Sequence, residues 1–192
     1  MTLIFATNNR HKTEEINAAL PAGFSIISLR EAGINIEIPE PHHTLEANAA
    51  EKAGTIYQLT GADCFSEDTG LEVDALNNEP GVHSARYAGE ERSDRNNILK
   101  LLRNLENHSN RKARFRTVIC LVLKGKQHFF EGVCEGWISR EPVGESGFGY
   151  DPVFIPDGAL HSFAEMTLEE KNRYSHRKKA LERLVAFLSN LS

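Results

Sequence analysis

The stretch ARFRTVICLVLKGKQHFFEGVCEGWI, residues 113–138, holds the two strongest strand patterns of the chain. Apolar and β-branched residues dominate Ala113–Leu123 and Gln127–Ile138, which favours two β-strands. The short polar segment Lys124-Gly125-Lys126 between them is typical of a hairpin turn. A long antiparallel hairpin in mid-chain is not expected in a purely parallel, doubly wound sheet. We therefore predict an α/β fold with a mixed sheet and a long central hairpin.

The chain on either side of this hairpin alternates between strand and helix patterns. Short apolar or alternating runs predict strands at Leu3–Thr7, Phe24–Ser28, Asn35–Ile38, Cys64–Ser66, Leu71–Ala75 and Pro152–Ile155. Apolar residues at helical spacing predict helices over 12–20, 45–59, 94–105 and 175–188. Thr44 and Ser93 are expected to cap the second and third of these helices.

Length and composition limit the class of protein. The 192 residues, 40% of them hydrophobic, are enough for one domain with a substantial core, and we assign residues 1–192 to one domain. The net charge of −5, from 22 basic and 27 acidic residues, argues against a partner that is a nucleic-acid polymer. It does not exclude a small anion, which needs only a local group of positive charges.

Cysteine usage and the N-terminus bear on the compartment. The three cysteines, Cys64, Cys120 and Cys134, are widely spaced and fit neither a disulfide framework nor a zinc site. They are expected to be buried, reduced thiols. No stretch has the pattern of a signal peptide or the length of a membrane span. These features favour a cytoplasmic protein that does not bind membranes.

A polar turn follows the first predicted strand. It consists of Thr7, Asn8, Asn9, Arg10, His11 and Lys12. Backbone N–H groups at the start of a helix bind phosphate well, and Lys12 adds a positive charge. The turn lacks the glycines of a Walker loop, and the same residues also fit an ordinary solvated turn.

Two adjacent acids follow the predicted strand at residues 64–66. Glu67 and Asp68 precede Thr69-Gly70, and carboxylates at the end of a strand suit Mg²⁺, which takes oxygen ligands. One of the acids is also suited to activating a water molecule. A loop with two surface acids is an equally simple interpretation.

Two further segments carry more polar chemistry than packing requires. In Gly147-Phe148-Gly149-Tyr150-Asp151-Pro152, the aromatic rings suit stacking on a base and Asp151 suits hydrogen bonding to it. A tight turn whose rings fill the core is the alternative. The basic segment Glu170–Arg177 lies at the start of the last predicted helix, where anions are favoured, and it also fits a solvated charged face.

Isolated charges complete the set. Glu40 lies in a rigid turn after Pro39, and Lys52 lies on the second predicted helix; both residue types are usually solvated in such positions. Acids for a metal, cations for phosphates and aromatic rings for a base together describe a site for a nucleotide polyphosphate.

These segments, in this order, resemble the inosine triphosphate pyrophosphatase family, whose members are also called XTP/dITP diphosphatases. The resemblance covers nearly the whole chain and rests on several long motifs. They are ATNNRHK (6–12), IPE (38–40), NAAEKA (48–53), SEDTGLEVDAL (66–76), PGVHSARYAG (80–89), GFGYDPVF (147–154) and FAEMTLEEKNRYSHRKKAL (163–181). Asn8 and His11 stand where many members have glycine, and Glu67 where many have a second aspartate.

The resemblance implies two α/β lobes that flank a nucleotide-binding cleft, a homodimer, and Mg²⁺-dependent hydrolysis of ITP, dITP and XTP to the monophosphate and pyrophosphate. It implies that Asp68 is the general base and a metal ligand, with Glu40 and Glu67 as the other expected metal ligands. The implied triphosphate contacts are Thr7, Asn8, Asn9, Arg10, His11, Lys12, Lys52 and Thr69. The implied base contacts are Phe148, Gly149, Tyr150, Asp151, Lys171, His176 and Arg177.

Two other classes compete with this interpretation. A nucleotide sensor that binds without turnover would keep the pocket, but the intact acids and basic segment disfavour it. A nucleic-acid-binding module is disfavoured by the net charge.

Overall fold

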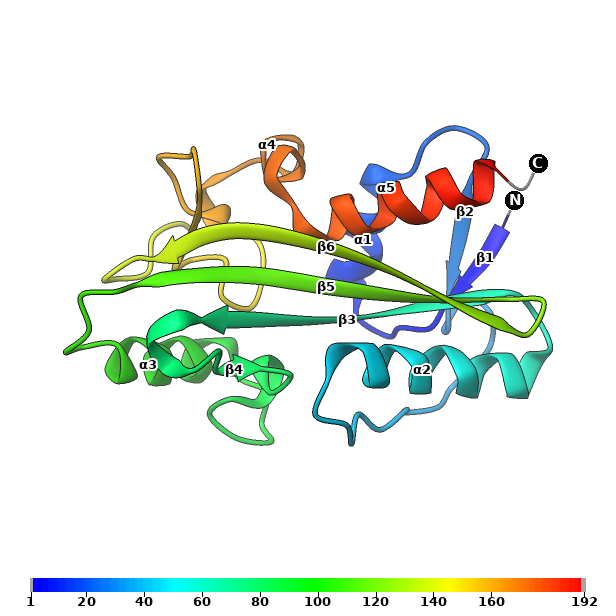
Figure 1. Cartoon of the computed structure of the whole chain (residues 1–192), viewed down its shortest axis with the longest axis horizontal. Helices are drawn as coiled ribbons and strands as arrows, with labels where there is room; N and C mark the ends of the chain where they lie inside the picture. Colours follow the sequence, from blue (N-terminus) through cyan, green and yellow to red (C-terminus); the bar gives the residue numbers. More distant parts are fainter. Residues whose placement is uncertain (1, 191–192) are drawn as a thin grey trace. The chain divides into compact units, whose positions relative to one another are not determined.

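The computed structural model describes residues 2–190, which group into two compact units (Figure 1). Unit 1 comprises residues 2–68, 117–132 and 176–190, and unit 2 comprises residues 69–116 and 133–175. The elements of unit 1 are β1 (Thr2–Phe5), α1 (Arg10–Ala19), β2 (Ser25–Ser28), α2 (Leu45–Thr60) and α5 (His176–Ser189). The elements of unit 2 are the short 3₁₀ helices η1 (Asp74–Leu76), η2 (Ser84–Arg86) and η3 (Phe163–Glu165), with β4 (Pro80–Gly81), α3 (Asp94–Asn104), β7 (Phe154–Pro156) and α4 (Leu168–Tyr174). Three long strands contribute residues to both units: β3 (Cys64–Val73), β5 (Lys112–Leu123) and β6 (Lys126–Ile138).

The strands form a mixed sheet. Their order is β2-β1-β3-β5-β6-β7, and β4 pairs with β3. β1 is parallel to β2 and β3, whereas β4 is antiparallel to β3 and β7 is antiparallel to β6. The predicted α/β class with a mixed sheet is therefore confirmed. The predicted hairpin is present as β5 and β6, which are joined by a tight turn at Lys124-Gly125 where both residues have positive φ.

In unit 1, helices cover both faces of the strands. α1 and α5 lie on one side of these strands and α2 on the other (Figure 1). Phe65, Ile119 and Leu121 pack in one core with residues of α1 and α5, whereas Cys64 and Cys120 pack in another with residues of α2. Successive residues of a strand point to opposite faces, so strands covered on both sides are apolar throughout. All three cysteines of the chain are buried free thiols, as the sequence predicted.

Two helices of unit 1, α1 and α2, begin at residues whose side chains cap them. Thr44 caps α2 by accepting a hydrogen bond from the Ala47 N–H, and Gly61 ends the helix in the left-handed conformation. Asn9 caps α1 in the same way, with its side-chain oxygen 3.1 Å from the Lys12 backbone nitrogen. Among the described residues, none of the helices combines the length and apolar character needed to cross a membrane.

β3 is longer than the sequence predicts. The two strands expected at residues 64–66 and 71–75 are one strand, Cys64–Val73, followed by η1. Thr69-Gly70 does not interrupt it, because Gly70 lets β4 approach closely: a Cβ on Gly70 would lie 2.6 Å from the carbonyl oxygen of Gly81. Glu67 and Asp68 therefore lie inside a strand and not in a loop.

Two other predictions need correction. Residues 35–38 form no strand; instead Ile34, Ile36 and Ile38 pack, partly buried, against the core that lies under α2. The segment 170–177 is not the start of one helix, because Ser175 separates α4 from α5. Thr167 caps α4 with a reciprocal bond from Glu170, a local signal that begins a separate helix.

Unit 2 has a core of its own. Leu101 of α3 and Leu105, the C-cap residue of that helix, pack with Phe115 of β5 and with Phe154 and Phe163. The rings of Phe115 and Phe154 lie 4.6 Å apart at an interplanar angle of 59°. The turn at residues 147–151 is anchored to this core through Tyr150, whose side chain is part of the core.

Candidate active site

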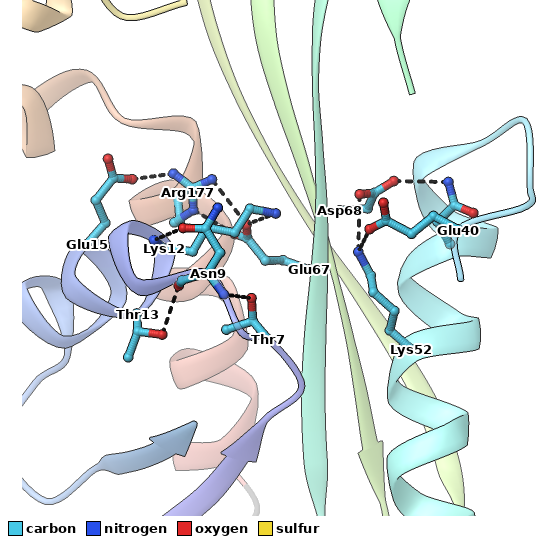
Figure 2. Close-up of polar contacts among 11 residues, drawn as sticks. Thr7, Asn9, Lys12, Thr13, Glu15, Glu40, Lys52, Glu67, Asp68 and Arg177 are labelled. Atoms are coloured by element: carbon cyan, nitrogen blue, oxygen red, sulfur yellow. Dashed lines mark hydrogen bonds and ion pairs between the residues drawn. The ribbon is translucent and has the colours of Figure 1, made fainter. Parts of the chain in front are cut away.

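Glu67 and Asp68 are neighbours in β3, and their side chains point to opposite faces of the strand (Figure 2). Each is buried, and each has its own set of charged partners in unit 1. We call Lys12, Glu15, Glu67 and Arg177 the Glu67 cluster. We call Glu40, Asn48, Lys52 and Asp68 the Asp68 cluster.

The Glu67 cluster is a buried chain of alternating charges. Arg177, the second residue of α5, binds both oxygens of Glu67, at 2.7 Å through Nε and 3.1 Å through Nη2. Its Nη1 binds Glu15 of α1. Lys12 Nζ lies 2.9 Å from Glu67 Oε1. Two carboxylates and two cations thus balance in a place where Glu67 and Arg177 are each only 2% exposed.

The protonation state of this cluster follows from its contacts. Burial alone would raise the pKa of Glu67, but Arg177 and Lys12 outweigh burial and hold that pKa well below its ordinary value. Burial likewise opposes the charge of Arg177, and Glu67 and Glu15 outweigh it and raise its pKa. Glu67 is therefore ionised at neutral pH, which makes it an acceptor that holds cations in place.

The 7–12 turn leads from β1 into α1 and places Lys12 beside Glu67. Asn9 N–H donates to Thr7 Oγ1 at 3.1 Å, and Asn8 Nδ2 donates to the Ile36 carbonyl at 3.2 Å. These bonds shape a turn whose backbone N–H groups stand at the N-terminus of α1 (Figure 2). Such a terminus favours anions.

Two members of that turn lie on its outer surface. Arg10 Nε is 2.7 Å from Glu14 Oε1 in a pair whose arginine side chain is 89% exposed. His11 Nδ1 lies 3.8 Å from the other oxygen of the same glutamate. An exposed pair of this kind contributes little to stability and leaves both side chains able to move.

The Asp68 cluster brings two carboxylates to one point. Lys52 Nζ lies 2.5 Å from Glu40 Oε1 and 3.2 Å from Asp68 Oδ1, and Asn48 Nδ2 donates to Asp68 Oδ2 at 3.2 Å. The Asn48 side chain also bonds to the backbone N–H and carbonyl of His42. Asn48 thereby links α2 to the segment that carries Glu40.

The surroundings of Asp68 and Lys52 shift the pKa values of both residues upward. Burial raises the pKa of Asp68, and the nearby Glu40 adds to this, although Lys52 and Lys12 act in the opposite direction. Burial opposes the charge of Lys52, but Asp68 and Glu40 outweigh it and raise the Lys52 pKa. A buried carboxylate with a raised pKa is a better proton acceptor than an ordinary aspartate.

Of the three predicted metal ligands, Glu40 and Asp68 lie close enough together to share one divalent metal ion, whereas Glu67 does not lie with them. Glu40 and Asp68 already converge on one positive charge, the ammonium of Lys52, and Mg²⁺ is often held by only one or two carboxylates with phosphate oxygens. Glu67 points to the other face of β3 (Figure 2). Among residues 2–190, no group of three or more His, Cys, Asp or Glu side chains is arranged to hold a metal ion.

In unit 2, the turn Gly147–Asp151, here called the 147–151 turn, carries its own buried ion pair. Lys171 Nζ of α4 lies 2.6 Å from Asp151 Oδ2, and the Phe148 backbone N–H donates to the same oxygen at 3.0 Å. The Lys171 ammonium is 5.3 Å from the centre of the Phe148 ring and 5.1 Å from that of Phe163. Such cation–π contacts add to the attraction of Asp151.

Tyr150 has a structural place in this turn. Its ring belongs to the core of unit 2, and its hydroxyl donates to the Ser84 carbonyl at 2.8 Å. Burial raises the pKa of Tyr150 well above its ordinary value. Of the two rings predicted to face a base, Tyr150 therefore fills the core, while Phe148 is only partly buried.

The comparison with known proteins settles the family. Residues 3–187 match the model of the Ham1 family. This chain belongs to the Ham1 family. Membership confirms the family that the motifs indicated.

Individual Ham1 relatives cover the whole chain. A Flavobacterium psychrophilum protein named dITP/XTP pyrophosphatase is 50% identical over 190 residues, which are 99% of this chain and 100% of that protein. A Porphyromonas gingivalis protein of the same name is 52% identical over 187 residues, 97% and 96% of the two chains. Among solved structures, the Ham1 protein of Staphylococcus aureus has a TM-score of 0.90 at 36% identity and covers 100% of both chains.

The predicted site residues of this Ham1 protein divide between the two units. Unit 1 holds the 7–12 turn, Glu40, Lys52, Glu67, Asp68, His176 and Arg177. Unit 2 holds Thr69, Lys171 and the residues of the 147–151 turn. The segment 170–177 is therefore shared, with Lys171 beside Asp151 and Arg177 beside Glu67. The roles assigned to these residues stay predictions.

Three polar residues that bind predicted site residues were not identified from the sequence. Glu15 binds Arg177, Asn48 binds Asp68, and Asp94 accepts a hydrogen bond from the Gly149 backbone N–H. Glu15 stands three positions after Lys12 and thus on the same side of α1, which is a signal in the sequence. The partners of Asn48 and Asp94 lie 20 and 55 positions away, and no local pattern predicts them.

Proposed function

We propose that this protein is a nucleoside triphosphate pyrophosphatase that hydrolyses the non-standard purine nucleotides ITP, dITP and XTP to the monophosphate and pyrophosphate. The observation that carries the proposal is the pair of carboxylates, Glu40 and Asp68, converging on Lys52 in a chain of the Ham1 family. Relatives about half identical over their full length bear the name dITP/XTP pyrophosphatase.

Glu40 and Asp68 are the residues that would hold a magnesium ion. When bound, Mg²⁺ neutralises phosphate charge and stabilises the leaving pyrophosphate. Lys52 lies between the two carboxylates and is the group that would turn from them toward a phosphate. Glu67 is held by Arg177 and Lys12, and we assign it to positioning Lys12 rather than to the metal.

Asp68 is suited to be the general base. Its buried position and raised pKa favour accepting a proton from a water molecule. The water oxygen would attack the α-phosphorus, the bond from that phosphorus to the bridging oxygen would break, and pyrophosphate would leave. Asn48 fixes the orientation of the carboxylate through its bond to Oδ2.

Lys12 and the N-terminus of α1 would bind the triphosphate. Lys12 is oriented by Glu67, Glu67 is bound by Arg177, and Arg177 is bound in turn by Glu15. A lysine held in this way loses little side-chain freedom when phosphate binds.

The 147–151 turn would recognise the base. Phe148 offers a ring for stacking, and Asp151 and Lys171 form a buried acceptor–donor pair for the edge of a purine. A 6-oxo group accepts a hydrogen bond, whereas the 6-amino group of adenine would leave a buried donor unmatched, which disfavours ATP.

One assay tests the proposal directly. The protein is incubated with ITP and Mg²⁺ in ¹⁸O-labelled water, and the products are identified by mass spectrometry. We expect IMP and pyrophosphate, with the label in IMP, because attack at the α-phosphorus leaves the water oxygen there. Orthophosphate as the first product, label in pyrophosphate, or binding without products would contradict the proposal, and the last would indicate a nucleotide sensor.

The remaining predictions concern the protein's surroundings. A homodimer, a cytoplasmic location, a free nucleotide as the substrate, and the absence of a nucleic-acid or membrane partner all stay predictions. Light scattering of the purified protein tests the first of them.

A further inference from the structure

The 147–151 turn is tied to α3 by one charged hydrogen bond. The backbone N–H of Gly149 donates to Asp94 Oδ2 at 2.7 Å, across 55 positions of sequence. A hydrogen bond to an ionised carboxylate is shorter and stronger than a bond between neutral groups. The contact lies within unit 2, and Asp94 lies outside the sequence motifs that carry the family resemblance.

The start of α3 is anchored by other residues, so the Asp94 carboxylate is available to the turn. Ser93 is the N-cap, with Oγ accepting from the Asn96 N–H at 3.3 Å. The buried Asn97 accepts from the Ala88 N–H at 2.7 Å and donates to the Ala85 carbonyl at 3.1 Å. These bonds fix the first turn of the helix and therefore the position of the Asp94 backbone.

The bond to Asp94 fixes the peptide between Phe148 and Gly149. The consecutive N–H groups of Phe148 and Gly149 are taken by two carboxylates, Asp151 and Asp94. Gly149 has φ +60°, in the left-handed region, and Tyr150 is fixed by its bond to Ser84. With the N–H of Gly149 released, the peptide between Phe148 and Gly149 would lose this restraint, and so would the backbone of Phe148, whose own N–H orients Asp151.

We propose that Asp94 is a positioning residue for base recognition: it holds the Gly149 N–H and thereby fixes the conformation in which Phe148 and Asp151 meet the purine. This inference rests on the proposed function, because it assigns Asp94 to the base half of that substrate. It predicts an effect on the base and none on the phosphates, for which Lys12, Lys52 and the N-terminus of α1 are the contacts proposed in unit 1.

Three variants test it. Asp94→Ala removes the acceptor, Asp94→Asn keeps a carbonyl oxygen at the same place, and Ser93→Ala weakens the cap of α3 without touching the turn. Each is assayed for KM and kcat with ITP, and for inhibition by inorganic tripolyphosphate, which has no base. Exchange of the Gly149 amide is followed by NMR.

For Asp94→Ala we expect a KM for ITP about tenfold higher, as loss of a charge-assisted hydrogen bond suggests, with kcat changed less than KM. The inhibition constant of tripolyphosphate should stay the same, and the Gly149 amide should exchange faster. The KM of Asp94→Asn should lie close to that of the wild type. Ser93→Ala should lower the melting temperature and raise KM much less than Asp94→Ala does, because the two bonds of Asn97 still hold the first turn of α3.

Three results would overturn the inference. One is an equal change in the inhibition by tripolyphosphate, another is a KM unchanged in Asp94→Ala, and the third is a KM that rises as much in Ser93→Ala. Failure of the proposed function looks different, because the wild-type protein would then release no pyrophosphate. In that case ITP binding is measured by calorimetry, and equal affinity of wild type and Asp94→Ala would overturn the positioning role too.

Discussion

Glu67 and Asp68 are joined by one peptide bond, yet their carboxylates lie on opposite faces of β3 and belong to different clusters (Figure 2). Glu67 binds Arg177 and Lys12, whereas Asp68 binds Lys52 and Asn48. The alternation of a β-strand is the cause. It lets two adjacent acids have pKa values displaced in opposite directions, Glu67 downward and Asp68 upward.

The first prediction concerns Asp68→Asn. Without a proton acceptor, kcat for ITP should fall at least about 100-fold. The unfolding free energy should not fall by more than about 1 kcal/mol, because burial disfavours the charge of Asp68 and an amide of the same shape removes that cost.

Steady-state kinetics and urea unfolding measure the two effects. Asp74→Asn, which changes an exposed acid in η1, serves as the control and should alter neither. A variant that keeps near wild-type turnover would mean that Asp68 is not the base.

The second prediction concerns Glu67→Gln and its dependence on pH. The variant leaves Arg177 and Lys12 with less negative charge in a buried place, and at pH 7 it should lose about 3–5 kcal/mol of unfolding free energy. The pKa of Glu67 is lowered in the folded state, so its contribution is present above the unfolded value of about 4.3 and is lost as pH falls toward the folded value.

Urea unfolding at several pH values between 7 and 3 measures this difference. The gap between wild type and variant should narrow below about pH 4.3. Glu182→Gln, which breaks only a surface pair with Lys178, should show a small gap at every pH. A gap for Glu67→Gln that does not change with pH would contradict the assignment.

The third prediction concerns removal of the metal. A chelator should abolish ITP hydrolysis but leave the melting temperature of the wild type nearly unchanged, because Lys52 supplies positive charge to Glu40 and Asp68. In Lys52→Met the two carboxylates lose that charge, and Mg²⁺ should then raise the melting temperature by several degrees.

Thermal unfolding with and without Mg²⁺ compares the two proteins, and added Mg²⁺ should restore wild-type activity after chelation. Wild-type protein that unfolds on chelation would show that the metal has a structural role. If Mg²⁺ does not change the melting temperature of Lys52→Met, Glu40 and Asp68 do not hold the metal.

The fourth prediction compares Gly147 with a control glycine outside the turn, Gly158. Both have positive φ, so alanine at either costs about 1 kcal/mol of backbone strain. A Cβ on Gly147 would lie 2.1 Å from Asp151 Oδ2, whereas a Cβ on Gly158 meets nothing within 4 Å.

Gly147→Ala should therefore displace Asp151 from Lys171 and raise the KM for ITP, while Gly158→Ala should change stability alone. Kinetics and urea unfolding on both variants check this. Equal KM values in the two variants would show that Asp151 does not depend on Gly147.

Local chemistry in the sequence was enough for much of the fold. The hairpin at 113–138 and the caps Thr44 and Ser93 are present as predicted, because each depends on residues within a few positions. The long β3 was not predicted, because its continuity depends on the close approach of Gly81 to Gly70.

For the site, the sequence by itself determined which side chains carry the chemistry, and its motifs indicated the family. Only the tertiary structure decided which of these charged side chains form ion pairs with one another. Glu67 and Asp68 looked like one acidic pair, and the pleat of β3 separates them. Lys171 and Arg177 looked like one basic segment, and the break at Ser175 sends one to Asp151 and the other to Glu67. The physical reason is that charge in a buried place needs a partner at contact distance, and for most of these groups that partner lies far along the chain.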